Sequence, residues 1–279
     1  MELLETANEI IKNMESKIIN TGIDIDKFHD INEKDIKVGV DLGTSNIVIT
    51  ILDKHNRPLL GALKQGSVVK DGIVVDYIGT VSIVKELKEK LEKYLNIELK
   101  HAATAIPPGI MSGNTKIIKN VIQSSGFYVT NVIDEPEAAS KVLNIENGAV
   151  VDIGGGTTGV SVIENGKVIF SADEPTGGTH LTLVTAGNYN MSFDAAEKYK
   201  LDPKNINMIF PIVIPVIEKM ADIVLKRIKD YHVECIYLVG GTCCLNGLED
   251  IFEKYTGIKT IKPYNPLLVT PIGIAMSDI

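Results

Sequence analysis

The sequence predicts an α/β protein made of two related domains. Its 279 residues exceed the ~100–200 residues of one typical domain. One pattern also occurs twice: an apolar strand ending in aspartate, a glycine-containing turn and a returning strand, at 36–52 and 148–163. The two aspartates, Asp41 and Asp152, are 111 positions apart, which is far too long for a solenoid repeat. We therefore expect two similar domains that face each other across a cleft, a favoured place for ligands.

Composition and charge narrow the class of protein. Hydrophobic residues make up 44% of the chain and charged residues 23%, which is typical of a globular protein, and the absence of Trp predicts an aliphatic core. The net charge of −8, without a dense Lys/Arg cluster, argues against a nucleic-acid binder. No apolar run approaches the ~18 residues of a membrane span, and the acidic N-terminus lacks a signal-peptide core. Three cysteines without metal-ligand spacing favour a reduced, cytoplasmic protein.

The first half of the chain begins with an amphipathic helix. Apolar residues recur every three or four positions over 2–20, from Leu3 to Ile18, and the polar residues 21–35 are typical of a linker. Short apolar runs then predict five strands, and a turn is expected at 70–72. The strands are expected over 36–42, 46–52, 58–64, 101–106 and 127–133, and the helices over 78–95, 113–125 and 135–143.

The second half repeats this order. Two strands within 148–163 are separated by the glycine-rich turn, and a third strand follows over 167–172. We expect helices near 179–200 and 206–230, a buried strand over 236–241 and a helix over 243–256. A strand over 258–261 and a helix over 267–277 complete the chain.

Two aspartate-ended turns carry the first chemical signal. In Asp41-Leu42-Gly43-Thr44-Ser45-Asn46, backbone N–H groups and two hydroxyls suit phosphate oxygens, and Asp41 could hold a hydrated Mg²⁺. In Asp152-Ile153-Gly154-Gly155-Gly156-Thr157-Thr158, three glycines cost about 0.5–1 kcal/mol each, which suggests that they have a function. Each turn alone is also compatible with a plain hairpin. Together the two turns could bind one polyphosphate from opposite sides.

Two further segments are less specific. Gly240-Gly241-Thr242 follows a buried strand and would let a ligand approach the next helix, although a plain strand–helix connection is the alternative. Glu135 lies in an acidic, proline-containing segment that suits a helix start, but its place at a strand end also makes it a candidate for activating a water. The sequence contains no P-loop, no G-x-G-x-x-G fingerprint and no Ser-His-Asp pattern.

The ordered motifs resemble those of the actin-like ATPase superfamily, which includes Hsp70 chaperones, the bacterial actin MreB and sugar kinases. VGVDLGTSN, DEPEAA, VVDIGGGTTG, LVGGT and PIGIAM are similar, in that order, to its phosphate-1, connect-1, phosphate-2, adenosine and connect-2 motifs. The resemblance covers about residues 37–277 and implies an actin-like, ribonuclease H-like fold. Size, overall likeness and the N-terminal helix make the chain most similar to the chaperone-like proteins of ethanolamine utilisation.

The resemblance also implies residue roles. Asp41 and Asp152 would hold Mg²⁺ through waters, and Glu135 would orient the attacking water, so that these three form the catalytic set. The phosphates of ATP or ADP would be bound by Gly43, Thr44, Ser45, Asn46, Gly154, Gly155, Gly156 and Thr157, and the ribose and adenine by Gly240, Gly241 and Thr242. The resemblance also implies the domain limits: an N-terminal helix with linker (1–35), a first domain (36–146) completed by the last helix (263–279), and a second domain (147–262).

Several departures from the superfamily pattern bear on activity. Only residues 201–234 separate AEKYK (196–200) from Cys235, so we expect subdomain IIB, which clamps adenine in larger relatives, to be absent. Lys226, Arg227 and Lys229 could substitute for it, although a solvated helix face is the alternative. GGTHLT (177–182) lacks the usual acidic residues, Leu267 stands where Hsp70s carry an acid, and no equivalent of the Hsp70 catalytic lysine is identified. We therefore expect nucleotide binding with at most slow hydrolysis.

These features favour a cytoplasmic ATP-binding, chaperone-like protein that assists ethanolamine ammonia-lyase or microcompartment assembly. The alternative is a nucleotide-dependent scaffold similar to the pilus-assembly relatives of actin, with little or no turnover. A small-molecule kinase is disfavoured because the chain lacks the large insertions of such enzymes. We expect no peptide-binding domain after residue 279, so we expect the helix over 2–20 either to contact an enzyme or shell protein of the microcompartment or to pack on its own body. We expect neither a nucleic-acid nor a membrane partner.

Overall fold

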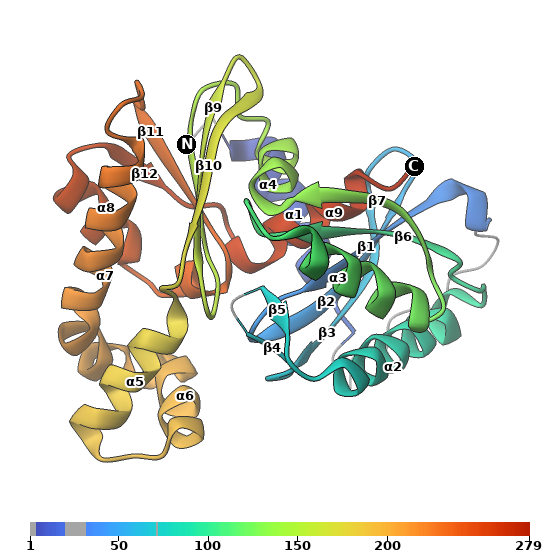
Figure 1. Ribbon diagram of the computed structural model, residues 1–279, viewed down its shortest axis with the longest axis horizontal. Coiled ribbons are helices and arrows are strands. Elements are labelled where there is room, and N and C mark those ends of the chain that lie inside the picture. The colour runs from blue at the N-terminus through green and yellow to red at the C-terminus, as the bar shows by residue number, and fades with distance from the viewer. Residues whose placement is uncertain (1–3, 20–31, 71) are drawn as a thin grey trace.

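The computed structural model describes residues 4–19, 32–70 and 72–279, which form two lobes, each built on a five-stranded sheet (Figure 1). The strand order is β3-β2-β1-β6-β7 in the first sheet and β10-β9-β8-β11-β12 in the second. In each sheet three consecutive strands pair antiparallel, and the central strand pairs in parallel with a later one. The same topology therefore occurs twice, as the repeated sequence pattern predicts.

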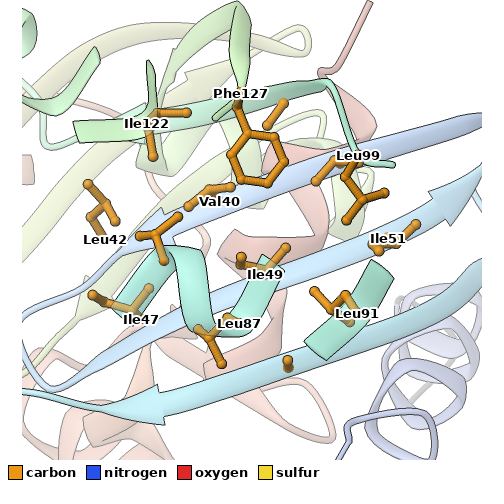
Figure 2. Close-up of a cluster of buried hydrophobic side chains, with 14 of the residues drawn as sticks. Val40, Leu42, Ile47, Ile49, Ile51, Leu87, Leu91, Leu99, Ile122 and Phe127 are labelled. Carbon is orange, nitrogen blue, oxygen red and sulfur yellow. The ribbon is translucent and has the colours of Figure 1, made fainter. Parts of the chain in front are cut away.

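The first lobe places helices against an aliphatic sheet. Side chains of β1 and β2, including Val40, Ile49 and Ile51, pack against Leu87 and Leu91 of the α2 helix (Figure 2). The strands are β1 (Ile36–Leu42), β2 (Asn46–Asp53), β3 (Pro58–Gln65), β6 (His101–Ile106) and β7 (Tyr128–Asp134), preceded by the 3-10 helix η2 (Glu33–Asp35). The helices are α2 (Tyr77–Leu95), α3 (Ser112–Ser124) and α4 (Glu135–Leu143).

A small hairpin precedes α2. Its strands are β4 (Val69–Lys70) and β5 (Ile73–Val74), where the sequence predicts only a turn. The α2 helix begins after Asp76, whose side chain accepts a hydrogen bond from the Gly79 N–H at 2.8 Å. It ends at Asn96, which adopts a left-handed conformation.

The second lobe has the predicted strands, but two of its predicted helices begin or end differently. The expected helix over 179–200 is interrupted at Asn190, which is left-handed, and a new helix begins where Ser192 caps the Ala195 N–H. The expected helix over 243–256 begins only at Leu248, because Gly247 has a φ of 85°. The elements are β8 (Gly148–Ile153), β9 (Thr158–Glu164), β10 (Lys167–Glu174), α5 (Gly178–Tyr189), α6 (Phe193–Leu201), η3 (Pro203–Asn205), α7 (Ile206–Ile228), β11 (Cys235–Val239), η4 (Gly241–Cys244), α8 (Leu248–Thr256) and β12 (Lys259–Ile261).

The span between α6 and β11 is filled by η3 and the single long helix α7. Seven side chains along α7 are buried against the second sheet, which is why this helix is part of the lobe's core. The expected absence of an inserted subdomain IIB is confirmed for this fully described span. None of the described helices is long and apolar enough to cross a membrane.

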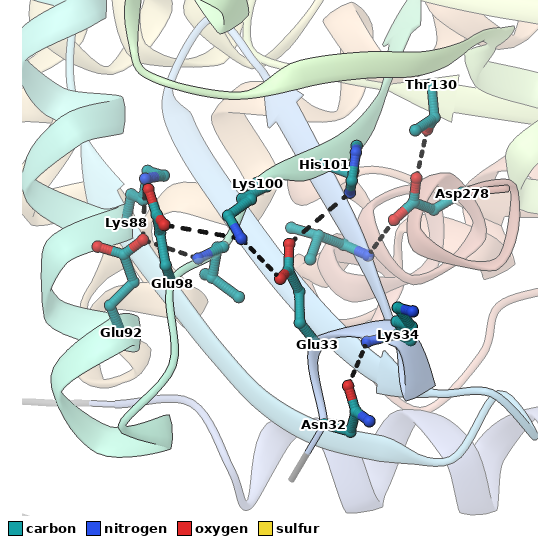
Figure 3. Close-up of polar contacts among 12 residues, drawn as sticks. Asn32, Glu33, Lys34, Lys88, Glu92, Glu98, Lys100, His101, Thr130 and Asp278 are labelled. Atoms are coloured by element: carbon teal, nitrogen blue, oxygen red, sulfur yellow. Dashed lines mark hydrogen bonds and ion pairs between the residues drawn. The ribbon is translucent and has the colours of Figure 1, made fainter.

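The C-terminal helix returns to the first lobe. After η5 (Pro266–Leu268), α9 (Val269–Met276) packs against α4 and β1, and Gly273 lies so close to the Ala138 carbonyl that a side chain there would overlap it. The buried Asp278 accepts hydrogen bonds from the Thr130 hydroxyl and, at 2.8 Å, from the Val38 N–H (Figure 3). These contacts fix the end of the chain on the first sheet.

The N-terminal helix α1 (Glu5–Glu15) packs on the body of the protein. Its side chains Ile11 and Met14 are fully buried in a cluster that also contains residues of α4, α9 and the second sheet. The following segment joins the edge of the first sheet, where the Ile19 N–H donates to the Gly61 carbonyl at 2.7 Å. Of the two alternatives for the helix expected over 2–20, packing on its own body is therefore the one that the described residues show. Residues 21–31 of the predicted linker over 21–35 lie outside the described residues.

Candidate functional site

The two aspartates of the repeated motif lie at equivalent places in the two sheets. Asp41 is near the end of β1 and Asp152 near the end of β8, and each of these strands is the middle one of its sheet. Burial raises the pKa of Asp41 from its usual 3.8 to about 7, and the charge of Asp152 contributes to this rise. The aspartates of the two lobes are therefore close enough to repel each other.

Asp152 is held by a residue that the sequence did not single out. The Thr270 hydroxyl donates a hydrogen bond to Asp152 Oδ2 at 2.8 Å, and both side chains are buried. Burial raises the pKa of Asp152, while the bond from Thr270 lowers it. On the other side, a Cβ at Gly240 would overlap Asp152 Oδ1, so the turn after β11 must carry a glycine there.

Glu135 joins this carboxylate group from the first lobe. It is the first residue of α4 and directly follows β7. Burial raises its pKa well above the usual value, and the charges of Asp152, Asp41 and Asp173 add to that effect in decreasing order. The three predicted catalytic residues are thus brought together from three separate elements.

Asp173 is a fourth carboxylate that the sequence analysis missed. It lies on β10 and pairs across β9 with Gly159, which itself pairs with Asp152 on β8. Because Gly159 has no side chain, the space between the two aspartates stays open: a Cβ there would lie 3.8 Å from Asp173 Oδ1 and 3.9 Å from Asp152 Cβ. The register of three strands creates this neighbourhood, and no local sequence signal reports it.

The two predicted phosphate-binding turns meet between the lobes. The first turn, Gly43 to Asn46, joins β1 to β2, and the second, Gly154 to Thr157, joins β8 to β9. The second is closed by a bond of 3.0 Å from the Gly154 N–H to the Thr157 carbonyl. A Cβ at Gly155 would overlap Ser45 Oγ, so the turns are in contact across the lobes.

The third predicted turn, Gly240 to Thr242, is attached to the second. The Thr242 hydroxyl donates to the Gly154 carbonyl at 2.8 Å, and the Gly178 N–H at the start of α5 donates to the same oxygen at 2.9 Å. Gly240 has a φ of 91°, which favours glycine. The predicted adenosine residues therefore adjoin the predicted phosphate residues.

A lysine–glutamate pair lies beside this junction. Lys200 Nζ donates to Glu197 Oε2 and to the Thr182 hydroxyl, both at 2.7 Å, and to the Gly178 carbonyl at 3.2 Å. The Lys200 side chain is only 11% exposed. Both residues belong to the AEKYK segment, but their proximity to the glycine turns depends on the fold of α5 against α6.

Two of the three basic residues considered as substitutes for subdomain IIB are engaged elsewhere. Lys226 forms an exposed ion pair with Asp222 at 2.5 Å, and Arg227 pairs with Glu174. The solvated helix face is therefore the better description of Lys226, and the pair Glu197–Lys200 is the charged pair that adjoins the turns.

The carboxylates suit a hydrated divalent cation. Carboxylate oxygens are the donors that Mg²⁺ prefers, and both the burial and the mutual repulsion that raise the pKa of Asp41 and Glu135 would be offset by a positive ion. Among the described residues, no group of three or more His, Cys, Asp or Glu side chains could hold a metal ion directly. The buried carboxylates of Asp41, Asp152 and Glu135 are of the donor type that fits a divalent cation that keeps several of its waters.

Comparisons with known proteins decide the family. A model of the type IV pilus assembly protein PilM matches residues 137–270, and a model of the MreB/Mbl protein matches residues 60–186. The ethanolamine utilization protein EutJ of Escherichia coli (strain K12) is 41% identical over 246 residues, which cover 88% of this chain and 87% of that protein. The chain belongs to the EutJ family.

Solved structures agree with this assignment. The crystal structure of EutJ from Carboxydothermus hydrogenoformans is similar with a TM-score of 0.86 and 47% identity, and the match covers 99% of this chain and 98% of that one. The crystal structure of MreB 5 of Spiroplasma citri bound to AMPPNP has a TM-score of 0.70 at 16% identity, covering 87% of this chain and 95% of that one. The actin-like fold expected from the sequence is thereby confirmed for this EutJ-family protein.

Proposed function

We propose that this EutJ-family chain is a chaperone-like protein of ethanolamine utilisation that binds ATP or ADP with Mg²⁺ between its two lobes. The observation that carries the proposal is the meeting of two glycine turns and two strand-end aspartates across the lobes. Such turns offer backbone N–H groups to phosphate oxygens, and opening of the Ser45–Gly155 contact would admit the phosphate chain. The AMPPNP-bound MreB 5 structure supports a nucleotide on this fold.

The phosphate end of the site would use Gly43, Thr44, Ser45 and Asn46 from one side and Gly154 to Thr157 from the other. Asp41 and Asp152 would orient waters around Mg²⁺, which supplies positive charge to the phosphates when bound. Thr270 would keep Asp152 in the correct orientation through its 2.8 Å bond. Catalysis in such a site is mainly positioning and charge stabilisation, so exact placement of these side chains matters.

The nucleoside end would use Gly240, Gly241 and Thr242 together with Glu197 and Lys200. Glu197 and Lys200 are the charged groups next to Gly178 and hence next to the glycine turns. A carboxylate and an ammonium can accept from and donate to the two ribose hydroxyls. This pair would hold the nucleoside where larger relatives use subdomain IIB.

Glu135 would act on the attacking water. In its ionised form it can accept a hydrogen bond, and then a proton, from a water beside the terminal phosphate. Burial, and then the charges of Asp152 and Asp41, raise the pKa of Glu135 in the ligand-free protein, so its ionisation requires compensating positive charge in the site. Hydrolysis is therefore expected only with the cation present, and slowly.

Phosphate release from ATP tests the activity. We expect slow, Mg²⁺-dependent release that Glu135→Gln abolishes while ATP still binds. Glu137→Gln is a matched control, since Glu137 is exposed on the same helix and its carboxylate pairs with Lys141 at 3.6 Å. Normal release by Glu135→Gln would refute the assigned role of Glu135.

A second candidate function is a nucleotide-dependent scaffold with little or no turnover. It is favoured by the match of the PilM model to residues 137–270 and by the single helix that fills the place of subdomain IIB. Nucleotide binding without phosphate release, in wild type as in Glu135→Gln, would select it.

The partners we propose are enzymes or shell proteins of ethanolamine utilisation, and the place of action is the cytoplasm, in association with a microcompartment. The family assignment supports this choice. Co-sedimentation with purified ethanolamine ammonia-lyase and with shell proteins, each with ATP, with ADP and without nucleotide, tests it. Absence of co-sedimentation under all conditions would contradict the proposed partners.

A further inference from the structure

The chain returns from the second lobe to the first through a short crossing segment. This segment, residues 262–268, joins β12 to α9 and contains η5. The N-terminal helix α1 packs against it where the two lobes meet, and shares a buried apolar cluster with α4, α9 and the second sheet (Figure 1). The position of the crossing segment therefore depends on α1 as well as on the two lobes.

Three polar side chains on one face of α1 contact the crossing segment. Asn8 Oδ1 accepts a hydrogen bond from the Tyr264 N–H at 2.8 Å. Glu15 Oε1 accepts one from Asn265 Nδ2 at 2.7 Å. Lys12 Nζ lies 5.0 Å from the centre of the Tyr264 ring. Positions 8, 12 and 15 have the spacing of one helix face, so the three contacts form together when α1 packs on the body.

The crossing segment in turn supports the predicted nucleoside turn, Gly240 to Thr242. The Pro266 carbonyl accepts a hydrogen bond from the Gly240 N–H at 3.0 Å. A Cβ at Gly241 would lie 3.2 Å from Leu267 Cδ1, so the Leu267 side chain lies directly against the turn. The backbone and a side chain of the crossing segment thus fix the place of the nucleoside turn.

Asn265 joins the two sets of contacts. Its Nδ2 donates to Glu15, whereas its Oδ1 accepts a hydrogen bond from the Leu267 N–H at 3.2 Å and caps η5. A displacement of α1 would therefore reorient the residue at the start of η5. Because η5 contains the Pro266 carbonyl, the displacement would reach Gly240.

The second phosphate turn has supports that do not pass through α1. The Gly154 N–H donates to the Thr157 carbonyl at 3.0 Å within the turn. The Gly154 carbonyl accepts from the Gly178 N–H at 2.9 Å in addition to the Thr242 hydroxyl. A change in α1 should therefore affect the nucleoside end of the site more than the phosphate end.

We propose that Asn8, Lys12 and Glu15 are positioning residues, which act through the crossing segment to hold the nucleoside turn in the geometry that binds a nucleotide. The inference rests on the proposed nucleotide site and assigns α1 a role in it. Without these contacts, η5 would shift and the nucleoside would bind less tightly, while a polyphosphate without a nucleoside would bind as before.

The test compares two double variants of the full chain. Asn8→Ala with Glu15→Ala removes both acceptors that α1 offers to the crossing segment. Glu9→Ala with Asn13→Ala is the matched control, because it changes the same two residue types at exposed positions of the same helix. Both double variants should fold, since alanine favours a helix and the buried face of α1 is unchanged.

Titration calorimetry with ADP and with pyrophosphate, each with Mg²⁺, examines the two ends of the site separately. We expect the Asn8/Glu15 variant to bind ADP about three- to tenfold more weakly, as the loss of one or two hydrogen bonds implies, and pyrophosphate as the wild type does. Asn8→Asp with Glu15→Gln retains both acceptor oxygens and should restore the affinity for ADP. Equal weakening of both ligands, or normal ADP binding by the Asn8/Glu15 variant, would overturn the proposal.

Hydrogen exchange without nucleotide separates this inference from the proposed function. The Gly240 amide should exchange about three- to tenfold faster in the Asn8/Glu15 variant than in the wild type, because its bond to Pro266 is less well held. The Glu9/Asn13 variant should exchange at the wild-type rate. Unchanged exchange at Gly240 would overturn the role of α1 even if ADP binds. Absence of ADP binding by the wild type would instead refute the nucleotide site itself, and with it any role of α1 there.

Discussion

The Thr270 hydroxyl donates a 2.8 Å hydrogen bond to Asp152 Oδ2, and this bond joins the helix packed on the first lobe to the central strand of the second. Thr270 is the second residue of α9, which contacts α4 and β1 of the first lobe. A movement of the lobes that separates α9 from β8 would therefore break this contact to Asp152, a predicted metal-binding residue.

Thr270→Val should destabilise the protein by about 1–3 kcal/mol, because it leaves a buried carboxylate oxygen without its donor. Urea unfolding at neutral pH measures this loss. Thr270→Ser retains the hydroxyl and should recover most of the stability. Equal stabilities of Thr270→Val and the wild type would contradict the importance of the bond.

Without Mg²⁺ and nucleotide, stability should fall as pH rises from about 4 to about 7. The folded protein keeps the Asp41 proton up to its raised pKa of about 7, whereas the unfolded chain releases it near 3.8. The folded state thus binds more protons in this window, and the free energy of unfolding decreases with pH. Asp41→Asn should remove a few kcal/mol of this change in the free energy of unfolding between pH 4 and 7. Asp250→Asn, on an exposed position of α8, should not. Urea unfolding at several pH values measures this change.

Gly155→Ala should weaken nucleotide binding about tenfold or more with a small effect on folding. Its methyl group would overlap Ser45 Oγ, so that the Ser45 side chain, a predicted phosphate ligand, must leave its place. Gly187→Ala, exposed in α5 with no atom within 4 Å of the new methyl group, is the matched control. Titration calorimetry with ADP compares the two variants. The expectation fails if both bind ADP like the wild type.

Glu197→Gln should remove discrimination between ATP and 2′-deoxy-ATP. If Glu197 and Lys200 hold the ribose, the wild type binds ATP more tightly, because the deoxynucleotide leaves a polar partner unpaired. Competition binding with both nucleotides gives the ratio. Equal affinities in the wild type would place the ribose elsewhere.

Ile11→Ala in α1 should lower the free energy of unfolding by about 2–5 kcal/mol, because Ile11 is fully buried in the cluster that α1 shares with α4, α9 and the second sheet. The exposed Glu9→Ala on the same helix should change it by less than about 0.5 kcal/mol. Thermal unfolding of both variants decides whether α1 is an integral part of the body in solution.

The sequence predicted those features that depend on local pattern. Asp41 and Asp152 were identified because each follows an apolar strand and precedes glycine, and both do lie at strand ends of matching sheets. Asn190 was not expected to divide a helix, because only its left-handed backbone reveals the break.

Tertiary relationships were not predictable in this way. Asp173 reaches the carboxylate group through the register of β8, β9 and β10, and Thr270 through the return of α9 from the second lobe to the first. Lys200 reaches the glycine turns because α6 folds back on α5. Each depends on contacts between distant segments, and none has a local signature.

The central claim is that Asp41, Asp152 and the two glycine turns form one Mg²⁺-nucleotide site. Isothermal titration of AMPPNP into the wild type and into Asp152→Asn, with Mg²⁺ and with excess EDTA, tests it most directly. We predict one saturable site per chain in the wild type, weakened at least about tenfold by EDTA or by Asp152→Asn. Absence of binding by the wild type, or binding indifferent to both Mg²⁺ and Asp152, would contradict the claim.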